Sequence, residues 1–173
     1  MLQTSLMQWI RPAFALLILG IFSAPMQAEP EYKSMGPDIF DRQAKAEEQI
    51  DQALARARHG NKRVVLLFGA NWCPWCRRLH QAFSEAPALR TALQKNFVLV
   101  YVDANTRTDK KRNAAVIERY GNPLRLGLPA MVVLDQDGTQ LTTQETASLA
   151  APADDEVARR VATFLSRWAP PAK

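Results

Sequence analysis

Apolar and polar residues recur along the chain with different periods, and each period predicts a different kind of element. Within residues 39–60 the apolar positions return every three to four residues, which predicts an amphipathic helix that ends near Gly60. These positions are Ala46, Ile50, Leu54 and Ala57. The next segment, RVVLLFGA, is apolar on both faces and too short for a helix, so it predicts a central strand covered on both sides.

Further elements follow in an order that alternates strands and helices. They are a helix over residues 73–96 that restarts at Pro87, a strand over 97–105, a short helix over 109–121, a hairpin over 130–143 that turns at Asp137-Gly138, and a helix over 152–168. The last helix is expected to bury Val157, Val161, Phe164, Leu165 and Trp168. This order predicts one α/β domain over residues 39–173, with a parallel strand pair and an antiparallel edge.

The first 28 residues carry the pattern of an export signal. Arg11 precedes a short apolar run that ends at Phe22, about half the ~20 residues that a membrane-spanning helix requires. We therefore expect residues 1–28 to be a signal peptide cleaved after Ala28, with an uncleaved membrane anchor as the alternative. Residues 29–38 contain Pro and Gly without periodicity and are expected to form a flexible lead-in.

The charge of the chain argues against a nucleic-acid partner. One of the 22 basic residues and none of the 17 acidic residues lie in the first 28, which leaves 21 basic against 17 acidic residues and a net charge of +4. No aromatic-interleaved basic stripe accompanies these charges, so we interpret them as a solvated surface.

The two cysteines, Cys73 and Cys76, could form a redox pair, an inert disulfide or part of a metal site. An inert disulfide would close a four-residue loop, which restricts little of the unfolded chain and adds little stability. A structural zinc site needs four ligands, and the only histidines are His59 and His80. Haem attachment is not expected, because Arg77 follows the second cysteine where a histidine is needed. A redox pair is favoured, and no metal is expected.

Three separated segments resemble the thioredoxin superfamily. They are FGANWCPWC at the end of the first strand, VYVDAN at the end of the second, and GLPAMVVLDQDG before the hairpin. The resemblance covers about residues 46–168 and is greatest to exported thioredoxin-like proteins and DsbD-type C-terminal domains. It implies a thioredoxin-like fold, with a central mixed β-sheet of about four strands flanked by helices.

The resemblance implies a site of thiol-disulfide exchange at Cys73 and Cys76, with no cofactor beyond this dithiol. Cys73 is the expected nucleophile, because helix N-termini lower a cysteine pKa from about 8.5 to roughly 3.5–7.5. Cys76 is expected to resolve the mixed disulfide by attacking Cys73. Leu128 and a cis Pro129 are implied to hold an extended substrate.

Side chains around the cysteines complete the expected substrate-facing set. Trp75 lies between the cysteines on an exposed turn and is favoured as a substrate contact, with Pro74 beside it. Trp72 is interpreted first as a packing residue and second as a substrate contact. Three basic residues are expected on the solvent face of the helix, with tuning of Cys73 as the alternative: Arg77, Arg78 and His80.

Two departures separate the chain from typical thioredoxins. Thioredoxins place a buried aspartate six residues before the first cysteine and a lysine on the next strand, whereas these positions are Leu67 and Leu99 here. We therefore expect no buried carboxylate base at the site. The dipeptide between the cysteines begins with proline, as in glutaredoxins and DsbA-type oxidants, and not with glycine. A few hydrogen bonds can set the direction of transfer, because about 30 mV corresponds to ~1.4 kcal/mol.

These features predict an exported thiol-disulfide oxidoreductase, periplasmic or secreted, that acts on protein disulfides or on a redox partner. The resemblance to DsbD-type domains favours reduction or isomerisation, with electrons from a membrane donor, over oxidation. We expect a monomer that meets the membrane only through an uncleaved signal segment. The alternative is a non-catalytic thioredoxin-fold module for binding or assembly.

Overall fold

The computed structural model describes residues 36–171, and its elements follow the order expected from the sequence. They are α1 (Ala46–Gly60), β1 (Arg63–Gly69), α2 (Pro74–Glu85), α3 (Pro87–Asn96), β2 (Phe97–Asp103), α4 (Ala114–Arg119), η1 (Pro123–Leu126), β3 (Ala130–Leu134), β4 (Gln140–Glu145), η2 (Ala147–Leu149) and α5 (Asp154–Arg167), where η marks a 3₁₀ helix. The expected signal peptide and its cleavage after Ala28 lie outside the described residues. Between residues 36 and 171, no helix is both long and apolar enough to span a membrane.

The four strands form one mixed sheet in the order β2-β1-β3-β4. β1 pairs in parallel with β2, so that Gly69 is the partner of Asp103 at the ends of the two strands. β1 is antiparallel to β3, and β3 is antiparallel to β4 through the predicted hairpin. Gly138 in its turn has a φ of +89°, which glycine adopts readily. The central strands β1 and β3 are buried at all positions except Arg63, which explains their continuous apolar sequence.

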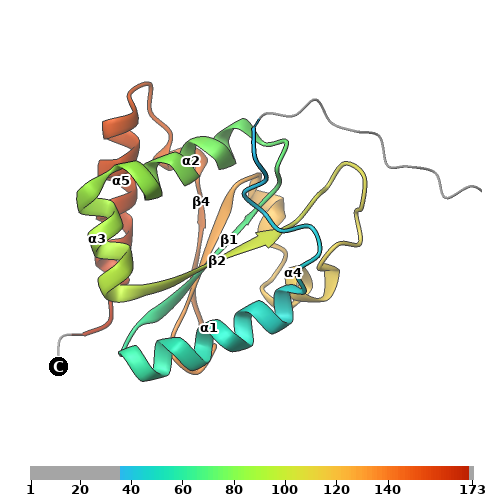
Figure 1. The fold of residues 1–173 in the computed structure, drawn as a ribbon, viewed down its shortest axis with the longest axis horizontal. Coiled ribbons are helices and arrows are strands. Elements are labelled where there is room, and N and C mark those ends of the chain that lie inside the picture. Colours follow the sequence, from blue (N-terminus) through green and yellow to red (C-terminus); the bar gives the residue numbers. More distant parts are fainter. Residues whose placement is uncertain (1–35, 172–173) are drawn as a thin grey trace, which may run out of the picture.

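Helices cover both faces of the sheet (Figure 1). α1 and α4 pack on one face, against the side of β1 that carries Phe68. α2, α3 and α5 pack on the other face, against the side that carries Leu67, and both cysteines belong to this second core. Trp168, which was expected to be buried, is partly exposed because α5 ends at Arg167 and Trp168 caps it.

Two helices have boundaries that the period of the apolar residues alone does not give. The bent helix over residues 73–96 is two helices, because Pro87 follows an extended Ala86 and cannot continue the first helix. The first helix begins at Ala46, well after residue 39. Residues 36–45, which we call the N-terminal strap, instead run irregularly from the N-terminal end of α2 past the end of β2 to α1 (Figure 1).

Candidate active site

Cys73 and Cys76 lie between the end of β1 and the first turn of α2, where they form a disulfide. Their Cα atoms are 5.2 Å apart, and the residues are 3% and 0% exposed. Cys73 is the N-cap of α2, and Pro74 follows at the first helical position, where the missing N–H of proline costs no hydrogen bond. The local sequence therefore places both sulfurs at a helix N-terminus, with Cys73 the outer of the two.

The helix end stabilises negative charge on Cys73. Its Sγ accepts a hydrogen bond from the backbone N–H of Cys76 at 3.2 Å. This N–H is one of the donors that a first helical turn leaves without a partner, and the helix dipole adds partial positive charge at the same place. When the disulfide is reduced, the same groups favour a Cys73 thiolate, the nucleophilic form.

The loop before β3 adopts the geometry that the resemblance implies. The Leu128–Pro129 peptide bond is cis, and Gly127 precedes it with a φ of +91°. The hydroxyl of Thr146 donates a hydrogen bond to the carbonyl oxygen of Pro129 at 2.5 Å, which ties the loop to the segment after β4. The loop therefore has a fixed place beside α2.

A cavity of about 220 Å³ lies between this loop, the start of α2 and the start of α5. Its lining is largely apolar and includes Trp75, Leu79, Leu128, Pro129, Leu149 and Val157. Three of the predicted substrate-facing residues, Trp75, Leu128 and Pro129, therefore line one cavity. Its position beside the cysteine pair suits an extended chain that carries an apolar side chain.

Trp75 stands at the rim of this cavity and is 48% exposed, the one large hydrophobic side chain that residues 36–171 leave exposed. The guanidinium of Arg78 lies 5.1 Å from the centroid of its ring. Arg78 is itself held by Asp154 at 2.5 Å and by the carbonyl oxygen of Pro152 at 2.7 Å. The indole is thus positioned by a cation that α5 and its preceding loop keep in place.

Trp72 does not line this cavity. It packs against the core that contains the cysteines, and the guanidinium of Arg107 lies 3.8 Å from its ring centroid. Its Nε1 is buried without a hydrogen-bond partner. These surroundings agree with a packing role for Trp72. Pro74, by contrast, is exposed at the tip of the turn.

The positions that carry charge in typical thioredoxins are apolar here, but a buried carboxylate lies elsewhere. Leu67 is fully buried and Leu99 is partly buried. Asp103, at the end of β2, is 3% exposed and contacts Arg112 at 3.4 Å. Burial raises the pKa of Asp103, while the backbone N–H of Asn105 and the Arg112 guanidinium oppose this rise. No role was predicted for Asp103 from the sequence, although it lies within VYVDAN, one of the segments that carry the resemblance.

The basic residues after Cys76 are bonded to other parts of the fold. Arg77 donates to the carbonyl oxygens of Asn71 and Pro37, both at 2.9 Å, so it does not simply face solvent as expected. His80 Nδ1 lies 2.8 Å from the hydroxyl of Tyr101. No group of three or more His, Cys, Asp or Glu side chains within residues 36–171 is placed to hold a metal ion.

Two further residues at the site were missed by the sequence analysis. Asn71, two residues before Cys73, is hydrogen-bonded to the strap at Phe40, and Phe40 belongs to the same buried cluster as the cysteines. The only signals in the sequence are an aromatic residue near the start of the segment expected to be the first helix and an asparagine beside the cysteines. Neither signal indicates that the two residues meet.

The fold and the cysteine pair together define a thioredoxin-like protein. Residues 50–152 match the thioredoxin-like domain family, which covers more than half of the chain, and the chain belongs to this family.

Relatives and solved structures agree with this assignment. The thiol:disulfide interchange protein DsbD of Cronobacter sakazakii is 28% identical over 153 residues, which cover 84% of this chain and 25% of that protein. The protein of the same name from Ralstonia nicotianae is 25% identical over 123 residues, 71% of this chain and 19% of that protein. The chain thus spans a quarter or less of the length of these relatives. A structure described as a disulphide isomerase from Xylella fastidiosa Temecula1 is 29% identical with a TM-score of 0.64, and the match covers 73% of this chain and 96% of that one.

Proposed function

We propose that this protein is a thiol-disulfide oxidoreductase that exchanges disulfides through Cys73 and Cys76. The observation that carries the proposal is the hydrogen bond from the Cys76 N–H to the Cys73 Sγ at the start of α2, beside an apolar cavity bordered by Leu128 and Pro129. This arrangement supplies a stabilised sulfur anion and a place for an extended peptide next to it.

In the reducing direction, the Cys73 thiolate attacks one sulfur of a substrate disulfide. A Cys73–substrate disulfide forms, and the other substrate sulfur leaves as a thiolate that takes up a proton. The Cys76 sulfur, after losing its proton, attacks Cys73 Sγ and releases the second substrate thiol. The two cysteines lose two electrons and two protons and the substrate disulfide gains them, so the step needs no bound cofactor. Oxidation is the same sequence in reverse.

Among the names of similar proteins, disulphide isomerase supports the reducing or isomerising side, whereas thiol:disulfide interchange protein states no direction. We further propose that residues 1–28 direct export and are removed after Ala28, and that the domain works in the periplasm or outside the cell. Its partners are then protein disulfides or a redox protein, including a membrane electron donor.

The alternative is a thioredoxin-fold module that binds or assembles another protein without redox turnover. One observation favours it, because the residues Cys73 and Cys76 are only 3% and 0% exposed. An exchange enzyme has to present the sulfur of Cys73 to a substrate, and the 3% exposure of Cys73 is all that the oxidised protein offers.

The test is the redox equilibrium of the cysteine pair in glutathione buffers, followed by the fluorescence of Trp72 and Trp75. A reversible transition below the glutathione couple supports a reductant, and one above it indicates an oxidant. A Cys76→Ser variant should then accumulate a mixed disulfide with substrate, and a Cys73→Ser variant should not. The absence of a reversible transition would favour the binding module.

A further inference from the structure

We propose that the N-terminal strap is a positioning device for Cys76, in which Phe40 closes the buried side of this cysteine and Asn71 and Arg77 hold Phe40 in place. The inference rests on the proposed function only in naming Cys76 the resolving cysteine. The strap precedes the matched family region at residues 50–152.

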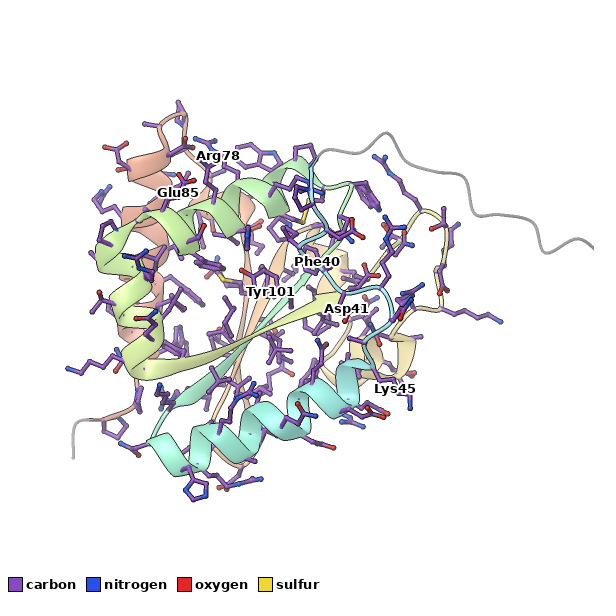
Figure 2. All side chains as sticks on the ribbon, in the orientation of Figure 1. Phe40, Asp41, Lys45, Arg78, Glu85 and Tyr101 are labelled. Carbon is purple, nitrogen blue, oxygen red and sulfur yellow. A yellow bond between two sulfur atoms is a disulfide. The ribbon has the colours of Figure 1, made fainter. Side chains whose placement is uncertain are left out.

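Phe40 fills the space beside Cys76. It is 0% exposed and belongs to the same buried cluster as both cysteines. Its ring meets the ring of Tyr101 edge to face, with 5.5 Å between the centroids (Figure 2). A Cβ built on Gly69 would lie 2.9 Å from Cys76 Sγ and closer still to Cζ of Phe40. The sulfur and the tip of the ring therefore meet at one point of the sheet, and only the absence of a side chain at Gly69 makes room for both.

Asn71 fastens the strap at this residue. Its Oδ1 accepts hydrogen bonds from the backbone N–H groups of Ile39 and Phe40, both at 2.9 Å. Its Nδ2 donates to the carbonyl oxygen of Phe40 at 2.8 Å. The side chain of Asn71 thus replaces a strand partner for the strap. Because Asn71 lies two residues before Cys73, the bonds join the strap directly to the cysteine loop.

Arg77 fastens the strap a second time, from the other side of the cysteine pair. Its guanidinium donates to the carbonyl oxygens of Pro37 at 2.9 Å and Gly36 at 3.4 Å. Its Nε donates to the carbonyl oxygen of Asn71 at 2.9 Å. Asn71 and Arg77 flank the cysteines in sequence, so the strap is bound to both ends of the CPWC turn. At its far end, Arg112 binds the carbonyl oxygen of Arg42.

This arrangement has a chemical consequence for the reduced protein. With Phe40 behind it, the Cys76 sulfur is shielded from water and from external disulfides, and Cys73 is its disulfide partner. The strap then favours resolution of the mixed disulfide over side reactions of Cys76, while the first attack by Cys73 does not depend on it. The ionisable groups around this cluster are Arg77 and His80 on α2 and, on β2, Tyr101 and Asp103. Tyr101 lies against Phe40 and 2.8 Å from His80 Nδ1, and Asp103 is the partner of Gly69.

The experiment measures alkylation of Cys76 by iodoacetamide in the full chain carrying Cys73→Ala, as a function of pH. Phe40→Ala is compared with Phe97→Ala, since Phe97 is buried in the same cluster but at the start of β2, six residues or about 20 Å from the strand end. Both truncations remove a buried ring and are expected to destabilise the fold to a similar extent. The Phe97→Ala control therefore separates the effect of losing the strap contact from the effect of a general loss of stability.

We expect Phe40→Ala to raise the alkylation rate of Cys76 roughly tenfold above that of Phe97→Ala, because a local opening replaces a sealed cluster. The pH midpoint of the reaction should fall in Phe40→Ala alone, because hydration stabilises the thiolate. If Phe40→Ala does not fold, the alkylation of Cys76 is measured in Asn71→Ala instead, because this change releases the strap and leaves the core intact. Equal rates and midpoints for Phe40→Ala and Phe97→Ala, or an Asn71→Ala protein that protects Cys76 like its parent, would overturn the proposal.

A second measurement keeps this proposal apart from the proposed function. The alkylation test uses a single cysteine and requires no redox turnover. It therefore tests the role of the strap even if the chain has no exchange activity. Conversely, a wild-type pair that titrates reversibly in glutathione establishes the proposed function whatever Phe40 does. If both hold, Phe40→Ala should prolong the mixed disulfide at Cys73 without slowing its formation, and Phe97→Ala should change neither.

Discussion

Gly69 and Cys76 are packed so closely that a Cβ on Gly69 would stand 2.9 Å from the Cys76 Sγ. Real Cβ atoms essentially never come so near a heavy atom. The neighbours are a buried sulfur and the ring of Phe40, neither of which can swing into solvent. A glycine at the end of β1 is therefore required by close approach, and not by backbone conformation.

Gly69→Ala should lower the free energy of unfolding of the oxidised protein by about 1–3 kcal/mol, the usual cost of overpacking a core. Gly60→Ala is the matched control, because its Cβ would meet only the flexible side chain of Lys62 at 3.2–3.4 Å. Gly60→Ala should be neutral or stabilise α1 slightly. Urea denaturation compares the two. The double variant Phe40→Leu/Gly69→Ala should lose less free energy of unfolding than the two single variants lose together. A loss equal to their sum would contradict this packing.

Trp75→Ala should reduce kcat/KM for a protein disulfide by about five- to thirtyfold, which corresponds to the ~1–2 kcal/mol typical of a partly buried aromatic contact. The effect should appear in KM, because Trp75 borders the cavity and not the reacting sulfurs. A small disulfide such as hydroxyethyl disulfide should react at the wild-type rate. Trp168→Ala, a tryptophan at the end of α5 outside this cavity, should leave both reactions unchanged. Equal losses for both substrates would contradict a binding role.

Local patterns in the sequence were sufficient for most of the elements and for the place of the cysteine pair in the fold. The period of the apolar positions located α1 and α5, and the Asp137-Gly138 turn located the hairpin. The CPWC segment directly after an apolar strand placed Cys73 at the start of a helix. The cis bond before Pro129 came from family resemblance, because nothing local to the sequence specifies the isomer.

The residues that the sequence did not reveal are those whose role depends on distant contacts. Phe40 and Asn71 are 31 residues apart, and no periodicity connects them. Asp103 looks like an ordinary polar residue at the end of a strand, and only the tertiary structure buries it beside Arg112. Such contacts depend on which segments the folded sheet brings together, and local patterns in a single sequence do not show which segments these are.

Arg112→Met should destabilise the protein more at pH 7 than at pH 4. Burial raises the pKa of Asp103, so its contribution to stability is complete below the unfolded pKa, near 3.9, and is lost as the pH rises through the folded pKa. Without Arg112 the buried carboxylate loses its ion pair and its pKa rises further. The loss of stability on ionisation then grows, by about 1–3 kcal/mol at pH 7. Urea denaturation at the two pH values measures the difference. Arg125→Met, which removes an exposed arginine bonded to the carbonyl oxygen of Gly121, should show no extra pH dependence. A loss that is equal at pH 4 and pH 7 would refute this account.

His80 should contribute a rise in stability with pH on the acid side of neutrality. Burial, and secondarily the charge of Arg77, lowers the pKa of His80 below 6.5. A base with a lowered folded-state pKa contributes fully above its unfolded pKa, near 6.5, and this contribution is lost as the pH falls through the folded value. His80→Gln should therefore flatten the rise in the free energy of unfolding that the wild type shows just below pH 6.5.

Tyr101→Phe separates the causes of this effect. Burial raises the pKa of the Tyr101 phenol to about 12, so below that pH its hydroxyl is available to donate to a neutral His80 Nδ1, 2.8 Å away. Tyr101→Phe removes this bond but leaves the ring of residue 101 and the charge of Arg77 in place. Most of the pH dependence should then remain, because burial is the larger cause. The His80 ring proton resonance, followed by NMR, should titrate with a midpoint below 6.5 in both proteins, and a midpoint at or above 6.5 in the wild type would rule the interpretation out.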